Sequence, residues 1–200
     1  YGTTRVEIGV QSLTERVYNI VNRGHNLQQV ISSFQIAKDA GYKVVAHMMP
    51  GLPTMSPKED IVDFKKLFEM DEFKPDMLKI YPALVLKDTP LYDDYKLGNY
   101  KPYSTEEMIT VLSEAKKSIP KWVRVMRIQR EITMDEIVDG PKMGNLRQKV
   151  HQELERQGTS CKCIRCREAG LNNKKEFPEL RLERIDYNAC GGKEVFLSFN

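Results

Sequence analysis

The stretch that decides the fold is residues 41–53, which read GYKVVAHMMPGLP. A glycine at its start is typical of the end of a helix. The apolar, β-branched run at 44–47 predicts a short buried strand, and the Pro-Gly-x-Pro turn that follows stops this strand abruptly. We therefore expect a helix feeding a parallel strand, whose carboxyl end opens into a loop of fixed course.

The same alternation of strand and helix continues on both sides of this stretch. Apolar runs predict further strands at 5–10, 77–81 and 122–128, and helical spacing of apolar residues predicts helices at 15–21, 27–40, from 57 onward and 105–118. Such an order predicts a parallel sheet with right-handed crossovers. Four strands make half of an eight-stranded β/α barrel. A doubly wound open sheet is the alternative, weakened because no glycine-rich phosphate loop follows a strand.

The pattern changes after residue 132. We expect a short helical turn at 135–138, a helix at 145–157, a cysteine-rich segment, and a polar stretch through Pro178. Residues 181–187 alternate like an edge strand, and Gly191-Gly192 predicts the turn of a hairpin that ends at 195–199. Residues 89–99 are predicted to be a polar excursion, with tyrosines at Tyr92 and Tyr95.

Composition limits the class of protein. The chain has 200 residues, 30% of them charged, and no run approaches the ~18 apolar residues of a membrane helix. It starts at Tyr1, directly before a predicted strand, so we expect the central part of a longer protein. The net charge is +3, but residues 121–200 carry 16 basic and 12 acidic side chains against 15 and 16 in residues 1–120. An anionic partner is therefore expected at the second half, and a solvated surface is the alternative.

Three of the four cysteines lie within six residues, in the sequence CKCIRC at 161–166. This crowding argues against a disulfide framework and for a metal in a reducing compartment, which places the protein in the cytoplasm. Cys161, Cys163 and Cys166 can wrap one tetrahedral zinc ion. For the fourth ligand His151 is favoured over Cys190, with water or another side chain as further options. Unbound thiols and an iron–sulfur cluster are the alternatives to zinc.

Polar side chains are expected at the carboxyl ends of three predicted strands. In a barrel, strand alternation would turn them inward toward a ligand. Structural hydrogen bonding is the alternative, although an inward lysine is costly to bury without a partner. The candidates are Glu7, Gln11, His47, Met49, Lys79 and Tyr81.

Basic side chains follow the last strand, the next helix and the cysteine segment. Phosphate contact is the functional interpretation, and a solvated surface is the alternative. The candidates are Arg127, Arg130, Arg147, Lys149, Lys162 and Arg165.

Seven segments, in this order, closely resemble the catalytic subunit of Elongator, a transfer-RNA wobble-uridine acetyltransferase family with archaeal and bacterial members. They are TRVEIGVQS at 4–12, NRGH at 22–25, HMMPGLP at 47–53, PDMLKIYP at 75–82, RIQR at 127–130, GNLR at 144–147 and GGKEVFLS at 191–198. The set covers nearly the whole chain, although GVQS alone occurs in many radical S-adenosylmethionine (SAM) enzymes.

The resemblance implies an α/β fold with three parts. Residues 1–134 would form the second half of a radical-SAM partial barrel, residues 135–180 a helical linker with the zinc loop, and residues 181–200 the first strands of a GNAT acetyltransferase domain. The parent enzyme would use a 4Fe–4S cluster, SAM and acetyl-CoA to install a carboxymethyl-type group at carbon 5 of uridine 34.

The family also implies roles for single residues. Glu7, Gln11, His47 and Lys79 would line the SAM or acetyl pocket, and the basic candidates would contact tRNA. The family's C-x-x-x-C-x-x-C cluster motif is absent from this sequence, so no cluster ligand is assigned here. A homodimer and accessory subunits are both open as partners. The alternatives are a non-catalytic zinc-containing RNA-binding module and another radical-SAM enzyme, such as a porphyrin-pathway oxidase.

Overall fold

A four-stranded parallel sheet forms the centre of the molecule. The computed structural model describes residues 2–171 and 179–200. The sheet order is β1 (Arg5–Gln11), β2 (Lys43–Met48), β3 (Met77–Ile80) and β5 (Arg124–Ile128), and each neighbouring pair is parallel. This arrangement confirms the predicted β-α alternation and places the carboxyl ends of all four strands at one edge.

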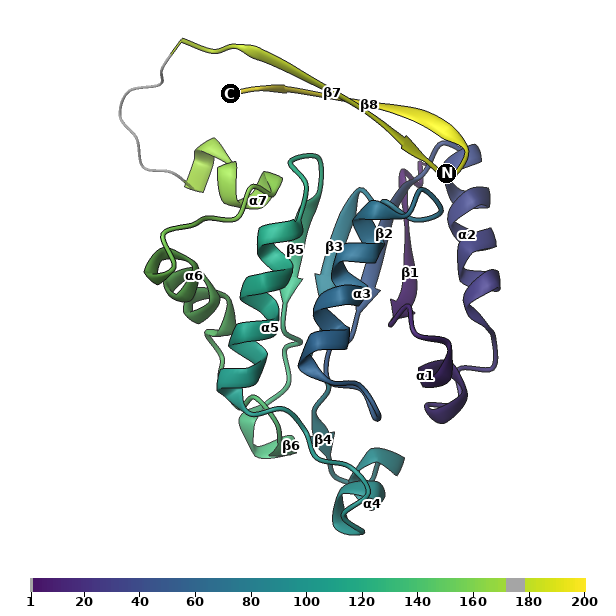
Figure 1. Ribbon diagram of the computed structural model, residues 1–200, viewed down its shortest axis with the longest axis vertical. Coiled ribbons are helices and arrows are strands. Elements are labelled where there is room, and N and C mark those ends of the chain that lie inside the picture. The colour runs from purple at the N-terminus through teal and green to yellow at the C-terminus, as the bar shows by residue number, and fades with distance from the viewer. Residues whose placement is uncertain (1, 172–178) are drawn as a thin grey trace.

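Three long helices cover one face of this sheet (Figure 1). They are α2 (Leu27–Asp39), α3 (Pro57–Glu69) and α5 (Thr105–Ser118), while the short α1 (Glu15–Ile20) follows the end of β1. Asn26, Ser56 and Ser104 each begin one long helix with a capping box, in which the cap side chain and the residue three positions on satisfy each other's backbone N–H groups.

The two faces of the sheet differ in chemistry because side chains alternate along a strand. Ala46, Leu78 and Val125 are fully buried in the main hydrophobic core with the apolar side chains of the helices. On β2 and β3, the polar His47 and Lys79 occupy the intervening, partly exposed positions. One face therefore carries the core, and the opposite face is free to carry chemistry.

Three elements were not expected from the sequence. Helix α4 (Pro90–Lys96) occupies the stretch predicted to be a polar excursion, and Thr89 caps it by accepting a hydrogen bond from the Tyr92 N–H. The strands β4 (Val85–Leu86) and β6 (Ile137–Asp139) pair antiparallel. The helical turn predicted at 135–138 is shorter than expected, because it covers Met134–Glu136 and then gives way to β6.

The last part of the chain packs against the sheet and its helices. Helix α6 (Leu146–Arg156) lies against α5, and the short α7 (Ile164–Arg167) lies against β5 and is followed by a helical turn, Ala169–Leu171. The predicted hairpin is confirmed as β7 (Leu182–Ala189) and β8 (Gly192–Phe199). In Figure 1 it lies across the amino-terminal ends of the parallel strands.

Charged and aromatic contacts hold the hairpin there. The Lys38 ammonium, with a side chain only 6% exposed, lies 2.9 Å from Asp76 and 3.0 Å from Glu194 of β8. Tyr187 of β7 stacks on Trp122 with ring centroids 4.1 Å apart. No helix within the described ranges is both long and apolar enough to cross a lipid bilayer.

A buried carboxylate fixes the Pro-Gly-Leu-Pro loop after β2. Asp60 Oδ2 accepts hydrogen bonds of 2.8 Å from both the Gly51 N–H and the Tyr103 hydroxyl. Gly51 has φ +86°, which disfavours a side chain there, and an added Cβ would lie 3.4 Å from the Tyr103 ring. Burial raises the pKa of Asp60 to about 7.

This buried acid gives the fold a pH dependence. Because the pKa of Asp60 rises from 3.8 to about 7 on folding, the native state binds more protons between these values. Stability from this group is therefore present at low pH and is lost as pH rises toward 7, by about 1.4 kcal/mol per pH unit. We expect Asp60→Asn to lack this loss, so that wild type becomes progressively less stable than the variant from pH 4 to pH 7. Urea unfolding of both proteins across this range measures the difference, and a constant gap would contradict the assignment.

Candidate functional site

A charged cluster lies on the face of the sheet opposite the long helices. Lys79 Nζ of β3 donates hydrogen bonds of 2.6 and 2.8 Å to the Glu7 carboxylate of β1. The same carboxylate lies 2.7 Å from His47 Nε2 of β2. The Tyr81 ring meets the His47 ring edge to face, with centroids 5.5 Å apart. Four of the six predicted pocket residues, from three neighbouring strands and the residue after β3, are thus brought together.

The Glu7 carboxylate of this cluster is ionised and partly exposed to solvent. A hydrogen bond from Lys79 is the largest influence on Glu7, and with that from His47 it outweighs partial burial and holds the pKa of this carboxyl below its usual range. Glu7 therefore stays ionised at neutral pH. Its side chain is 37% exposed, so the carboxylate can still accept hydrogen bonds from a ligand.

Gln11 and Met49 lie outside the charged cluster and line a neighbouring cavity. The Met49 N–H donates a 2.8 Å hydrogen bond to the Gln11 carbonyl, and both residues line a cavity of about 570 Å³ at the carboxyl ends of β1 and β2. Apolar residues such as Leu52 and Leu91 make up much of its wall. The six candidates therefore divide between a polar cluster and a neighbouring, more apolar cavity.

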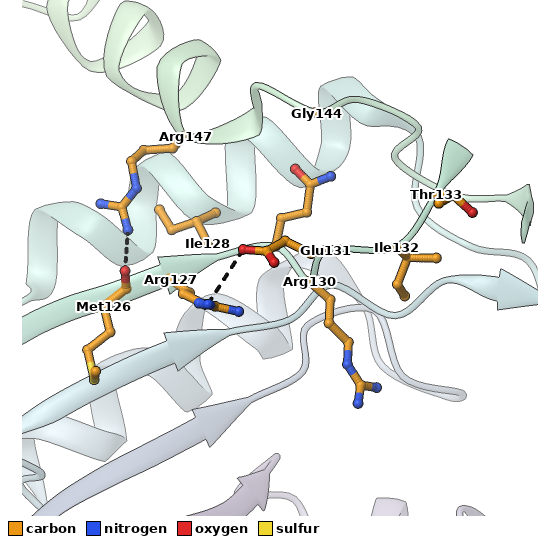
Figure 2. Close-up of a pocket in the computed structure, with 10 residues that line it drawn as sticks. Met126, Arg127, Ile128, Arg130, Glu131, Ile132, Thr133, Gly144 and Arg147 are labelled. Atoms are coloured by element: carbon orange, nitrogen blue, oxygen red, sulfur yellow. Dashed lines mark hydrogen bonds and ion pairs between the residues drawn. The ribbon is translucent and has the colours of Figure 1, made fainter. Parts of the chain in front are cut away.

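Three of the basic candidates line a cavity at the end of β5. Arg127, Arg130 and Arg147 surround a space of about 530 Å³ (Figure 2). Arg127 and Arg130 are exposed, and Arg127 lies 3.5 Å from Glu131. Gln129 between them has φ +90°, outside the range that most side chains adopt.

Arg147 differs from the other two arginines. Its Nη2 donates to the carbonyls of Val125 and Met126 at 3.3 and 3.2 Å, as Figure 2 shows for Met126. Its Nη1 is buried and finds no hydrogen-bond partner within the described part of the chain. Arg147 is thus partly committed to the backbone of β5. Of the remaining basic candidates, Lys149 and Lys162 are exposed, whereas Arg165 lies 3.4 Å from Glu168.

The three clustered cysteines converge as the sequence predicts. The sulfur atoms of Cys161, Cys163 and Cys166 all lie within 4.8 Å of one another. His151 stands at the rim of this cluster, with Nε2 3.6 Å from Cys166 Sγ. Cys190 lies elsewhere, since its thiol donates to the carbonyls of Glu72 and Phe73. Cys190 is therefore not the fourth ligand in this arrangement.

The cluster holds one thiolate and one neutral imidazole, both of which can bind a cation. Hydrogen bonds from Cys161 and Cys166 hold the pKa of the Cys163 thiol far below its usual range, so Cys163 carries the thiolate, while hydrogen bonds with Cys163 and Cys166 raise the pKa of Cys161. Burial, followed by the nearby charges of Lys116 and Arg147, lowers the pKa of His151. Thiolate and neutral imidazole are the forms that bind zinc, and the donor set fits such an ion.

Comparisons with known proteins agree with this architecture. The Radical SAM superfamily matches residues 1–67, and the Radical_SAM C-terminal domain matches residues 75–156. The chain is 48% identical to the tRNA uridine(34) acetyltransferase of Methanocaldococcus infernus over an alignment of 203 positions, which covers 99% of this chain and 38% of that protein. It is 44% identical to Elongator complex protein 3 of Saccharomyces cerevisiae over an alignment of 202 positions, which covers 100% of this chain and 36% of that protein.

A solved structure is also similar. The archaeal Methanocaldococcus infernus Elp3 with an N-terminal deletion superimposes with a TM-score of 0.95 at 47% identity, covering 99% of this chain and 48% of that one. This chain belongs to the Elp3 family of radical SAM proteins. The resemblance carried by the seven sequence segments is thereby confirmed. The chain spans a little over a third of the length of the curated relatives it matches.

Two residues of this Elp3-family chain were missed as site candidates. Arg23 donates to the Gly9 carbonyl and lines the cavity beside Gln11; its place in the NRGH segment could have marked it. Lys116 is fully buried beside His151 and Cys166. It follows Met108 and Leu112 at four-residue spacing, so helical periodicity places a charge in the buried stripe of α5.

Proposed function

We propose that this chain contributes part of the barrel of a radical SAM tRNA uridine(34) acetyltransferase. The whole enzyme would use a 4Fe–4S cluster, SAM and acetyl-CoA to install a carboxymethyl-type group at carbon 5 of wobble uridine 34. The observation that carries the proposal is the Glu7–His47–Lys79 cluster on the sheet face left open by the helices. The similarity to enzymes named for this activity supports the same conclusion.

We further propose that the sheet is the second half of a partial β/α barrel, extending over residues 1–134. In the described part of the chain the three long helices lie on one face of the sheet (Figure 1), the face with the buried apolar side chains, and a closed barrel would turn the charged face inward. Residues 135–180 would be the linker, of which 172–178 lie outside the described residues. The hairpin within residues 181–200 would begin a GNAT domain that binds acetyl-CoA.

The polar cluster and the adjoining cavity fit the parts of SAM. An ionised Glu7 can accept hydrogen bonds from an ammonium or hydroxyl group, and Lys79 can donate to a carboxylate. The more apolar cavity beside Gln11 and Met49 suits a flat, weakly polar base. A cluster and SAM would supply the radical chemistry. The four cysteines described here lack the family's cluster spacing, so the residues of this chain would bind and orient SAM.

Neutralising Lys79 tests this placement. We expect Lys79→Met to weaken SAM binding roughly tenfold, since a charge-assisted hydrogen bond contributes about 1.5–3 kcal/mol. Equilibrium titration of the full-length, cluster-loaded protein with SAM measures the change. The matched control is Lys65→Met, which removes the same charge from the exposed surface of α3. Equal affinities in Lys79→Met and wild type would exclude Lys79 from the SAM site.

We propose that the arginine-lined cavity after β5 contacts tRNA phosphates. Arg127 and Arg130 are exposed at its mouth, and Gln129 and Thr133 offer hydrogen-bonding groups nearby. Lys149, Lys162 and Arg165 would extend the positive surface toward the cysteine segment. Arg147 would act mainly by holding the strand end in place, because it already binds two carbonyls of β5.

Removing the exposed charges tests this surface. We expect Arg127→Ala with Arg130→Ala to weaken tRNA binding and to flatten its salt dependence by roughly 1.5 units of the log–log slope, as two phosphate contacts are lost. Lys58→Ala with Lys65→Ala on α3 is the control of equal charge. Binding isotherms at several salt concentrations give the slope, and an unchanged slope would remove both arginines from the RNA surface.

We propose that the cysteine cluster holds zinc, with Cys161, Cys163 and Cys166 as ligands and His151 as the fourth. The convergence of three sulfurs beside a neutral imidazole supports this assignment. A structural ion here would fix the segment between α6 and α7 against β5. The other expected partners, a homodimer or accessory subunits, and the cytoplasmic location remain predictions.

Measuring the zinc content by elemental analysis distinguishes a cysteine that binds the metal from one that does not. We expect Cys163→Ser to lose the bound zinc and to loosen residues 159–170, because its thiolate is central to the cluster. Cys190→Ser should retain one equivalent of zinc, since its thiol faces the carbonyls of Glu72 and Phe73 instead. Absence of zinc from the unmutated protein, or equal loss from both variants, would contradict the assignment.

A further inference from the structure

Lys116 is an unusual lysine because its side chain is fully buried. Its ammonium lies 3.0 Å from His151 Nε2 and 3.5 Å from Cys166 Sγ. Within the described residues it forms no ion pair with a carboxylate. Its neighbour Lys117 behaves as a surface lysine does, since it is about one-third exposed and lies 2.6 Å from Glu114.

A buried ammonium is expensive unless negative charge compensates it. The charged groups that face Lys116 belong to the cysteine cluster and come from α6 and the segment that follows it. Among the contacts of Lys116 within the described residues, the Cys166 thiol is the group that can carry a negative charge. The buried position of Lys116 is therefore explained by the cysteine cluster and by nothing else in its contacts.

The cysteine cluster, once it holds zinc, would carry a buried negative charge. A divalent zinc ion with three thiolates and one neutral imidazole keeps a net charge of −1, which is costly in a buried site. Arg147 approaches from the β5 side, but its guanidinium also binds the Val125 and Met126 carbonyls. Lys116 reaches the cluster from α5, where its ammonium lies beside His151 and donates a hydrogen bond to Cys166 Sγ. The two unfavourable burials offset each other.

We propose that Lys116 is a positioning residue for the metal site, which balances its residual negative charge and donates a hydrogen bond to the Cys166 sulfur. This inference rests on the proposed zinc site. Residues that act on metal ligands from outside commonly change metal affinity by about 10- to 100-fold. Lys116 also joins the cluster to α5, which packs on α3 and α6, so the metal would be coupled to the helical layer.

Zinc retention tests the charge. In the full-length protein, we expect Lys116→Met and Lys116→Gln each to lose zinc to a chelator at least tenfold faster than wild type, measured by elemental analysis over time. Lys117→Met is the matched control and should behave as wild type. Glutamine keeps a hydrogen-bond donor, so the pair separates loss of charge from loss of packing. Thermal melting of the zinc-saturated proteins identifies the variants that fold.

A spectroscopic measurement tests the contact with sulfur. In cobalt-substituted protein freed of iron, the thiolate-to-cobalt absorption should move to longer wavelength in Lys116→Met, because a thiolate without a hydrogen bond gives up electrons more readily. Lys117→Met should leave this band in place. Zinc-free wild-type protein would overturn the metal assignment itself. Zinc-bound wild type with an unchanged release rate in a folded Lys116 variant, or an unchanged band, would overturn the role of Lys116 alone.

Discussion

The parallel register of β1, β2 and β3 is the constraint on which the rest of the structure depends. It sets His47 directly beside Lys79 and brings Glu7 within hydrogen-bond distance of both. Since side chains alternate along a strand, a shift of one residue in any strand would exchange its polar and apolar positions. Burial of the apolar side chains under the helices sets the strand register, and this register in turn places Glu7, His47 and Lys79 on the opposite face.

Much of this arrangement could be predicted because its signals are local. The cap residues Asn26, Ser56 and Ser104 mark helix starts. In the sequence CKCIRC only one or two residues separate the cysteines, so their sulfurs can meet. Alternation predicts that Glu7, His47 and Lys79 share a face, although it does not predict the direct ion pair. The hairpin was also predictable, since Gly191-Gly192 stands between two alternating segments.

Other features depend on contacts between distant parts of the chain. The pairing of β4 with β6 joins strands about 50 residues apart and only two or three residues long, which no local pattern reveals. Gln11 lies apart from the charged cluster because it has a left-handed backbone conformation, φ +65°, which breaks the strand alternation at the end of β1. The burial of Lys116 is indicated in the sequence by its position in the apolar stripe of α5, four residues after Leu112.

Burial also changes what the net charge means. The excess of basic residues after residue 120 suggests a surface for nucleic acid, yet Arg147 of that region is half-buried and binds backbone carbonyls, and Arg124 pairs with Glu168 at 2.9 Å. Such cations stabilise the fold around β5 and add little to the field outside the protein. Of the six basic candidates, Arg127, Arg130, Lys149 and Lys162 are the ones whose exposure lets them form a positive surface. Fewer charges would then act on an RNA partner than the composition implies, and they would act from the rim of one cavity and the nearby cysteine segment.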